Sequence, residues 1–299
     1  MLTNSDRYLT LQIYSDRYIL NILLNQGRYD VSKEKNTRET TDQSIHRRKV
    51  LKLAVAAVGA AIVTPIAGVI EAASKLTPTA NPKEKTMKQK AFVYTELQIT
   101  VPKFDDIPWH KINMNIKKQP GFINKTWLFG VGNHSGGGLY AFDSIENAQK
   151  FVTGYFPGEA RGFGVAQTTR VFDADATEVA SRDMNSMHYD GKIDRKPGAF
   201  VYTEVQLHAV PFDTTAPWRE LNPVLKEQPG LLAKTWLSGL HTGTPGGLYA
   251  FDTIENATKF AVDYFPTEAK ALNAAFYTRV FDANATEAAS REMDSPFYT

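Results

Sequence analysis

Glutamates and aromatic residues recur at equivalent places in two long segments of the chain, and these side chains can do acid–base chemistry. Glu96 and Glu204 each follow a tyrosine by two residues, within segments whose apolar residues alternate as in a strand. Burial raises the pKa of a carboxyl group, and a carboxylate with a raised pKa suits the role of a general base. Glu96 and Glu204 are therefore the candidate catalytic residues.

Aromatic and cationic residues on the neighbouring predicted strands alternate in the same way. The aromatic candidates for substrate binding are Tyr94, Trp127, Tyr140, Tyr202, Trp236 and Tyr249. The candidate charge network is Lys125, Arg170, Lys234 and Arg279. If all these faces coincide, they enclose either an aromatic pocket with a catalytic base or an ion-pair network that fixes how two sheets pack. Buried charges need partners in both cases, and we favour the structural interpretation.

Several other kinds of chemistry are excluded or disfavoured. The chain has no cysteine, which excludes disulfides, thiolate metal sites and a cysteine nucleophile. None of the six histidines recurs in register and no pair has metal-ligand spacing, so neither a metal nor another cofactor is expected. The glycine-rich loops 130–138 and 239–247 lead into strands rather than helix N-termini, which argues against phosphate binding. Neither segment has a basic stripe interleaved with aromatics, so nucleic-acid binding is not expected.

The candidates recur because the chain contains one domain of about 100 residues twice. GGLYAFD stands at 137–143 and 246–252, and KTWL stands at 125–128 and 234–237. A period this long indicates a duplicated domain, since solenoid and propeller repeats run at roughly 20–50 residues. Two copies in one polypeptide predict a pseudo-dimer within the chain.

Each repeat has the pattern of a βαββαβ unit. In the first repeat, alternation predicts strands at 92–100, 122–129, 139–142 and 168–172. Helices are expected after Asp105-Asp106 and from Asp143 onward, where capping residues precede apolar positions at helical spacing. This order is ferredoxin-like, an α+β fold, with one face of each sheet left uncovered by helices. The two sheets are expected to pack against each other and close an intramolecular α+β barrel.

The region before the repeats resembles an export signal. Arg47 and Arg48 stand just before an apolar run from Leu53 to Ile70, as in a twin-arginine signal. An uncleaved membrane anchor is the alternative, since about 18 apolar residues nearly span a bilayer. Both versions place the repeats outside the cytoplasm, periplasmic or anchored on the extracytoplasmic side, with the export machinery as partner and membrane contact only through this segment.

The expected domain boundaries follow from these patterns. They are an N-terminal extension at 1–46, a signal or anchor at 47–76, a linker at 77–89, the first repeat at 90–189, a connector at 190–197 and the second repeat at 198–299.

Each repeat resembles the YdhR-type monooxygenase family of the dimeric α+β barrel superfamily. The matching residues in the first repeat are Pro120-Gly121, Lys125, Trp127, Gly137-Gly138, Tyr140, Phe142 and Val171-Phe172-Asp173. The resemblance implies a ligand cavity between sheet and helices, where Asn124 and Thr126 are expected as further substrate-binding residues.

Taken with the aromatic candidates, the resemblance implies a small-molecule ligand and a cofactor-independent monooxygenase that acts on an apolar or aromatic substrate. The alternative is a non-catalytic ligand-binding or stress-related protein on the same scaffold. A third possibility is that one repeat kept a site while the other became structural. Paired charges in a filled interior would favour the non-catalytic protein, and an unpaired carboxylate or histidine in an apolar pocket would favour the enzyme.

Overall fold

The computed structural model describes residues 88–207, 212 and 217–298, which contain both repeats. The first repeat consists of β1 (Ala91–Leu97), α2 (Trp109–Ile116), β2 (Phe122–Phe129), β3 (Gly136–Phe142), α3 (Ile145–Lys150), the π-helix η3 (Phe151–Tyr155), α4 (Phe156–Phe163), β4 (Gln167–Asp173) and α5 (Glu178–Asp183). The second consists of β5 (Ala199–Gln206), α7 (Trp218–Lys226), β6 (Leu231–Ser238), β7 (Pro245–Phe251), α8 (Ile254–Lys259), the π-helix η6 (Phe260–Tyr264), α9 (Phe265–Ala271), β8 (Ala275–Asp282) and α10 (Glu287–Glu292). Short 3₁₀ turns stand at Phe104–Asp106, Asp175–Thr177, Met187–Tyr189 and Pro296–Tyr298.

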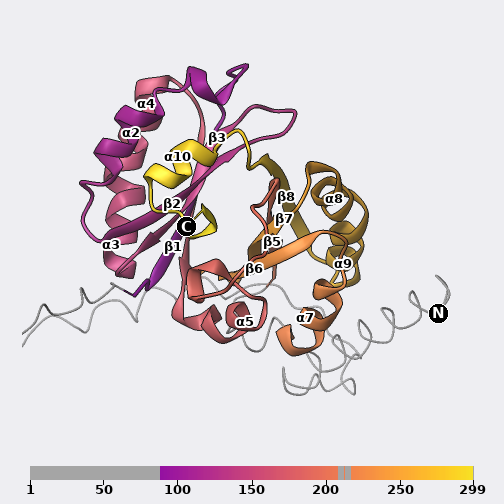
Figure 1. Ribbon diagram of the computed structural model, residues 1–299. Coiled ribbons are helices and arrows are strands. Elements are labelled where there is room, and N and C mark those ends of the chain that lie inside the picture. The colour runs from indigo at the N-terminus through magenta and orange to yellow at the C-terminus, as the bar shows by residue number, and fades with distance from the viewer. Residues whose placement is uncertain (1–87, 208–211, 213–216, 299) are drawn as a thin grey trace, which may run out of the picture. The chain divides into compact units, whose positions relative to one another are not determined.

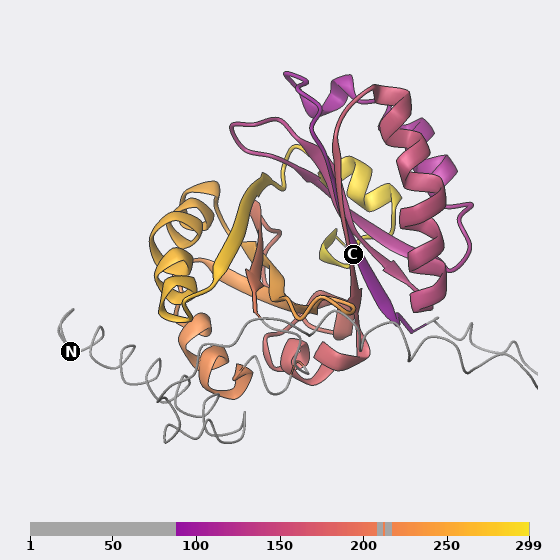
Figure 2. The same cartoon turned by 180° about the vertical axis from the view of Figure 1, so that it is seen from behind.

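Each repeat forms one antiparallel four-stranded sheet with the ferredoxin-like strand order. The orders are β2-β3-β1-β4 and β6-β7-β5-β8. Helices cover the outer face of each sheet, and the two inner faces look toward each other (Figures 1 and 2). The predicted fold, an α+β pseudo-dimer of two βαββαβ repeats packed sheet to sheet, is confirmed.

The edges of the two sheets meet and close the barrel. Gly130, after β2, bridges Phe281 of β8, and Phe172 of β4 bridges Gly239 after β6. Between the sheets lies one apolar core to which both repeats contribute, including Phe92, Leu139, Phe200 and Leu248. Burying this shared face gives the two repeats a common core, since neither sheet could leave it exposed without loss of stability.

The last helix of each repeat packs on the other repeat. The backbone N–H of Lys125 in β2 donates to the carbonyl of Met293, which follows α10, at 3.0 Å. The N–H of Trp127 donates to Ser290 Oγ at 2.9 Å. In the second repeat, Lys234 and Trp236 make the same contacts with Met184 and Ser181 at the end of α5. The edge strands β2 and β6 thus each have two backbone donors satisfied by the other repeat.

One expected loop is partly a strand. Gly136, Gly137 and Gly138 belong to β3, although the sequence predicted a loop through residue 138. A Cβ at Gly137 would lie 2.0 Å from the carbonyl oxygen of Thr95, so only glycine lets β1 and β3 approach there.

The predicted N-terminal extension, the export signal with Arg47 and Arg48, and most of the linker fall outside the described residues. Within the described ranges, no helix is long and apolar enough to cross a bilayer.

Candidate functional site

The two predicted catalytic glutamates lie between the sheets, and other side chains hold both of them. Glu96 is fully buried and accepts hydrogen bonds from the hydroxyls of Tyr94, at 3.0 Å, and Tyr277. It also pairs with Arg279 of the second repeat, whose Nε lies 3.4 Å away.

Glu204 of the second repeat has similar partners, and its ion pair is with an arginine of the first repeat. It accepts from Tyr202 at 2.9 Å and Gln206 at 2.7 Å, and pairs with Arg170 of the first repeat at 3.1 Å. These contacts are those of the structural network that the sequence favoured for Arg170 and Arg279. Each carboxylate has three side-chain partners, which leaves it poorly placed to take a proton from a ligand.

Three other predicted residues lie on the face opposite to the one expected. Lys125, Trp127 and Tyr140 face the helices rather than the barrel interior, as do their counterparts Lys234, Trp236 and Tyr249. The register explains the difference, because Tyr140 stands opposite Val93 rather than Tyr94. Alternation within one strand is visible in a sequence, whereas the pairing between strands decides which faces coincide.

The same register moves two polar candidates away from the helices. Leu128 and Ala141 belong to the inter-sheet core, and Asn124 and Thr126 share their face by alternation. Thr126 Oγ1 lies 2.8 Å from Ser295 Oγ of the second repeat. Asn124 and Thr126 therefore do not line a cavity beneath the helices, contrary to expectation.

Lys125 is the central residue on the helix side of the first sheet. Its side chain is 1% exposed, and its Nζ lies 2.8 Å from the centroid of the Trp127 ring and 4.7 Å from that of Tyr140. No carboxylate of the described residues lies within 4.0 Å of this Nζ. Gly138 makes room for the lysine, since a Cβ there would lie 2.6 Å from Lys125 Cε.

The Trp127 ring is fixed by a partner on α2. Its Nε1 donates to Asn113 Oδ1 at 2.8 Å, and Asn113 Nδ2 in turn donates to the carbonyl of Ala289 in α10. Trp236 and Asn222 repeat the first bond at 2.8 Å in the second repeat. The aromatic face presented to Lys125 is thus held by the Asn113 side chain of α2 and, through it, by a backbone carbonyl of α10.

A carboxylate that the sequence analysis missed faces Lys125 from the helical layer. Glu159 of α4 accepts a hydrogen bond from the Tyr155 hydroxyl at 3.3 Å, and Tyr155 ends the π-helix η3. Segments of π-helix occur frequently at functional sites. The second repeat has Tyr264 and Glu268 at the same places. The signal was present in the sequence, as YFPGEA at 155–160 and YFPTEA at 264–269.

Burial shifts both ionisable groups toward their neutral forms. Desolvation lowers the pKa of Lys125 well below its ordinary value, and the negative charge of Glu159 opposes this only in part. Desolvation raises the pKa of Glu159, against the effects of Lys125 and the Tyr155 hydroxyl. Lys234 and Glu268 are shifted in the same directions by the same cause. Paired shifts of this kind, in a buried site, mark candidates for acid–base chemistry.

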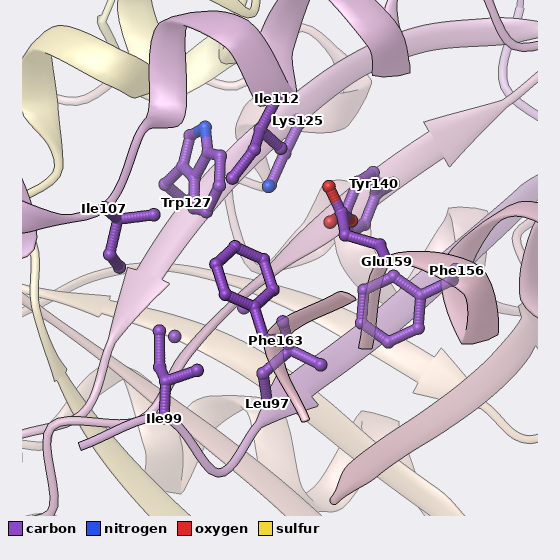
Figure 3. Close-up of a pocket in the computed structure, with 12 residues that line it drawn as sticks. Leu97, Ile99, Ile107, Ile112, Lys125, Trp127, Tyr140, Phe156, Glu159 and Phe163 are labelled. Atoms are coloured by element: carbon purple, nitrogen blue, oxygen red, sulfur yellow. The ribbon is translucent and has the colours of Figure 1, made fainter. Parts of the chain in front are cut away.

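A small cavity lies against this constellation in the first repeat. Its volume is about 20 Å³, which is room for a water molecule. Lys125 Nζ and the Glu159 carboxylate point toward the same space, and Phe163 stands in front of it (Figure 3). Phe163 lines the cavity and is 39% exposed to solvent. Aliphatic side chains complete the lining: Leu97, Ile99, Ile107 and Ile112.

The histidines of the described region are scattered. His110 pairs with Glu292 at 2.7 Å on the surface, and His188 is buried between aromatic rings. Within the described ranges, no group of three or more histidine or acidic side chains could hold a metal ion.

Comparison with solved structures finds similar folds at low sequence identity. An anthrone oxidase-like protein is 15% identical over 65% of this chain and 91% of its own, with a TM-score of 0.43. A putative monooxygenase from Lactobacillus acidophilus is 7% identical over 64% of this chain and 93% of its own, with a TM-score of 0.38. A chlorite dismutase mutant from Candidatus Nitrospira defluvii is 9% identical over 70% of this chain and 99% of its own, with a TM-score of 0.40.

Comparison by sequence covers the first repeat. No curated protein sequence matches the chain significantly. Residues 106–182 match the family model described as "Putative mono-oxygenase ydhR", and this segment contains Lys125, Trp127, Tyr140 and Glu159. The resemblance of the first repeat to the YdhR-type monooxygenase family is therefore confirmed.

Proposed function

We propose that this chain is a cofactor-independent monooxygenase that oxidises a small aromatic substrate with an acidic hydroxyl group. The observation that carries the proposal is the buried Lys125, which lines an apolar cavity together with Glu159 and has no ion-pair partner within 4.0 Å in the described region. The family match of residues 106–182 supports the same reaction class.

Lys125 acts as the base in this proposal. As a neutral amine it takes the proton of a phenolic substrate, and the Trp127 face then stabilises the resulting ammonium. The ammonium in turn stabilises the phenolate beside it, since opposite charges attract strongly in a low-dielectric site. Glu159, with its Tyr155 hydrogen bond, supplies and receives protons at the opposite side of the cavity.

The oxidation itself draws its electrons from the substrate. The phenolate passes one electron to O₂, and the phenoxyl radical and superoxide combine at a ring carbon to give a peroxide. Proton return from Lys125, loss of the ring proton and O–O cleavage then yield a quinone and water. For phenol the balance is C₆H₆O + O₂ → C₆H₄O₂ + H₂O. One oxygen atom enters the product and the other leaves as water.

A non-catalytic ligand-binding protein is the second candidate, and the side-chain-filled interior between the sheets, where Glu96 and Glu204 are both paired, favours it. Pockets that hold drug-sized ligands have volumes of roughly 300–1,000 Å³, far above the 20 Å³ found here. Binding a phenol at this place, with or without turnover, therefore requires Phe163 and its neighbours to move outward.

Oxygen consumption with a panel of phenols tests the proposal. The wild-type chain and the E159Q variant are compared with K118M, which changes an exposed lysine without an ion pair in the described region. We expect the wild type and K118M to consume oxygen and form quinone, and E159Q to lose most of the rate. Equal rates in wild type and E159Q would remove Glu159 from the site, and no quinone with any phenol would favour the non-catalytic protein.

We also propose that the repeats function outside the cytoplasm, because Arg47 and Arg48 precede an apolar run in the manner of a twin-arginine signal. Cell fractionation of the full chain and of its R47K/R48K variant tests this. Accumulation of the variant, but not of the wild type, in the cytoplasm is the expected result, and identical distributions would contradict the proposal.

A further inference from the structure

Two lysines of the described region differ from its other lysines in burial. Lys125 and Lys234 are each 1% exposed, and neither forms an ion pair within the described ranges. Lysines at the surface commonly pair with carboxylates, as Lys88, Lys90, Lys117, Lys150, Lys196, Lys226 and Lys259 do. The structure therefore keeps two primary amines in apolar surroundings without a counter-charge in contact.

We propose that Lys125 and Lys234 are nucleophiles that capture small apolar aldehydes or ketones as imines, a reaction that needs no oxygen. The proposal does not rest on the monooxygenase activity, since it uses the amine as a nucleophile rather than as a base. A buried lysine in a hydrophobic pocket is one of the arrangements by which proteins activate an amine.

The first requirement is an amine with a free lone pair. Desolvation lowers the pKa of both lysines well below the ordinary value, a shift toward the neutral amine. The Nζ of Lys234 has no hydrogen-bond partner in the described region, so no acceptor or donor competes with an incoming carbonyl carbon.

The second requirement is an acid that helps water to leave. The amine adds to the carbonyl carbon and gives a carbinolamine, and the carbinolamine hydroxyl must then depart as water. Glu159 has a raised pKa through burial, so its carboxyl group is able to donate the proton. Overall, R₂C=O and Lys–NH₂ give R₂C=N–Lys and H₂O, with no change in oxidation state.

The third requirement is an environment in which the product persists. The Trp127 and Tyr140 rings lie next to the amine, and their faces stabilise a protonated imine as they would an ammonium. Apolar side chains exclude water, which slows hydrolysis of the imine.

The second repeat carries the same three groups, and they make fewer hydrogen bonds there than in the first repeat. Lys234 Nζ, the Tyr264 hydroxyl and Glu268 Oε2 are all buried without a hydrogen-bond partner in the described region. Buried polar atoms normally find a partner, and three such atoms in one constellation indicate a place where a polar ligand atom would be satisfied. The carbinolamine hydroxyl is such an atom.

Reductive trapping of the full-length chain tests the proposal. The protein is treated with propanal and cyanoborohydride at pH 7 under argon for a short time, and propylated lysines are mapped by peptide mass spectrometry. We expect Lys125 and Lys234 to be propylated at least tenfold faster than the exposed Lys118. The α-amino group, whose ordinary pKa is near 7.7, serves as an internal reactivity standard.

Variants separate this outcome from non-specific alkylation. K125M should lose only the adduct at residue 125 and K234M only that at residue 234, while K118M should keep both. F163A opens the first cavity and should accelerate labelling of Lys125 but not of Lys234. Labelling confined to exposed lysines and the α-amino group, in both wild type and F163A, would overturn the proposal. Because oxygen is absent, a failure of the oxidase assay leaves this result unaffected.

Discussion

The rings of Tyr94 and Tyr202 stack face to face between the sheets, with centroids 3.8 Å apart and planes 4° from parallel. Each hydroxyl donates to the glutamate of its own repeat, and each glutamate pairs with an arginine of the other repeat. The stack and the two crossed ion pairs fix the same sheet-to-sheet alignment. A slide of one sheet by one residue would break all three contacts together.

Replacing Glu96 by glutamine should weaken the fold rather than the chemistry. E96Q removes the charge that faces Arg279, and because the arginine is one-third exposed, the loss in unfolding free energy is expected at roughly 1–3 kcal/mol. Urea unfolding followed by circular dichroism measures it. The oxidation rate at saturating substrate should stay within about twofold of wild type. A complete loss of turnover with unchanged stability would restore Glu96 as the catalytic base.

Replacing Lys125 by methionine should lower turnover without lowering stability. K125M removes an unpaired buried amine and keeps the volume, so the melting temperature should be unchanged or higher. Turnover should fall by about 10²–10⁴-fold, the usual contribution of a general base. Parallel calorimetry and oxygen-electrode assays check both quantities, and a stable variant with wild-type turnover would contradict the role of Lys125.

The chain should lose stability in acid through His188. Its ring contacts Phe92 edge to face at 4.9 Å, neither ring nitrogen has a hydrogen-bond partner in the described region, and burial lowers its pKa to about 3. A folded pKa below the ordinary 6.5 means that the folded state prefers the neutral ring. The stabilisation is complete above pH 6.5 and is lost as the pH falls toward 3.

The second repeat supplies the control for this pH dependence. Phe297 stands where the first repeat has His188 and contacts Phe200 edge to face, also at 4.9 Å. H188F should therefore fold normally. On acidification from pH 7 to pH 3, its unfolding free energy should fall by roughly 4 kcal/mol less than that of the wild type. Urea titrations between pH 7 and pH 3 measure the difference between the two proteins, and parallel curves would exclude His188 as the cause.

Alanine substitutions at two glycines can show which repeat carries the activity. A Cβ at Gly138 would lie 2.6 Å from Lys125 Cε, and one at Gly247 would lie 2.8 Å from Lys234 Cε. G138A should displace Lys125 and lower turnover by about 10²-fold, as small misplacements of catalytic groups do. G247A should do the same only if the second repeat is active. Steady-state rates of both variants, with circular dichroism as a check on folding, identify the working site or sites.

Much of the fold could be predicted because its determinants are local or repeated. The duplicated GGLYAFD and KTWL segments revealed the pseudo-dimer, and alternation located the strands. The site was harder. Tyr140 was assigned to the wrong face because strand register depends on contacts between distant segments. Glu159 was missed although it stands four residues after Tyr155, because its burial beside Lys125 depends on how the helical layer packs on the sheet.

The fusion of two barrel halves into one polypeptide frees each half to change alone. A symmetric homodimer must carry every substitution twice. Here the equivalent positions of the two repeats differ, with His188 in the first and Phe297 in the second, and Gly136 in the first and Pro245 in the second. Since the last helix of each half packs on the edge strand of the other, a mutation in that helix acts on the strand that carries the lysine of the other half. Selection can therefore tune the two amines separately while a single shared scaffold is retained.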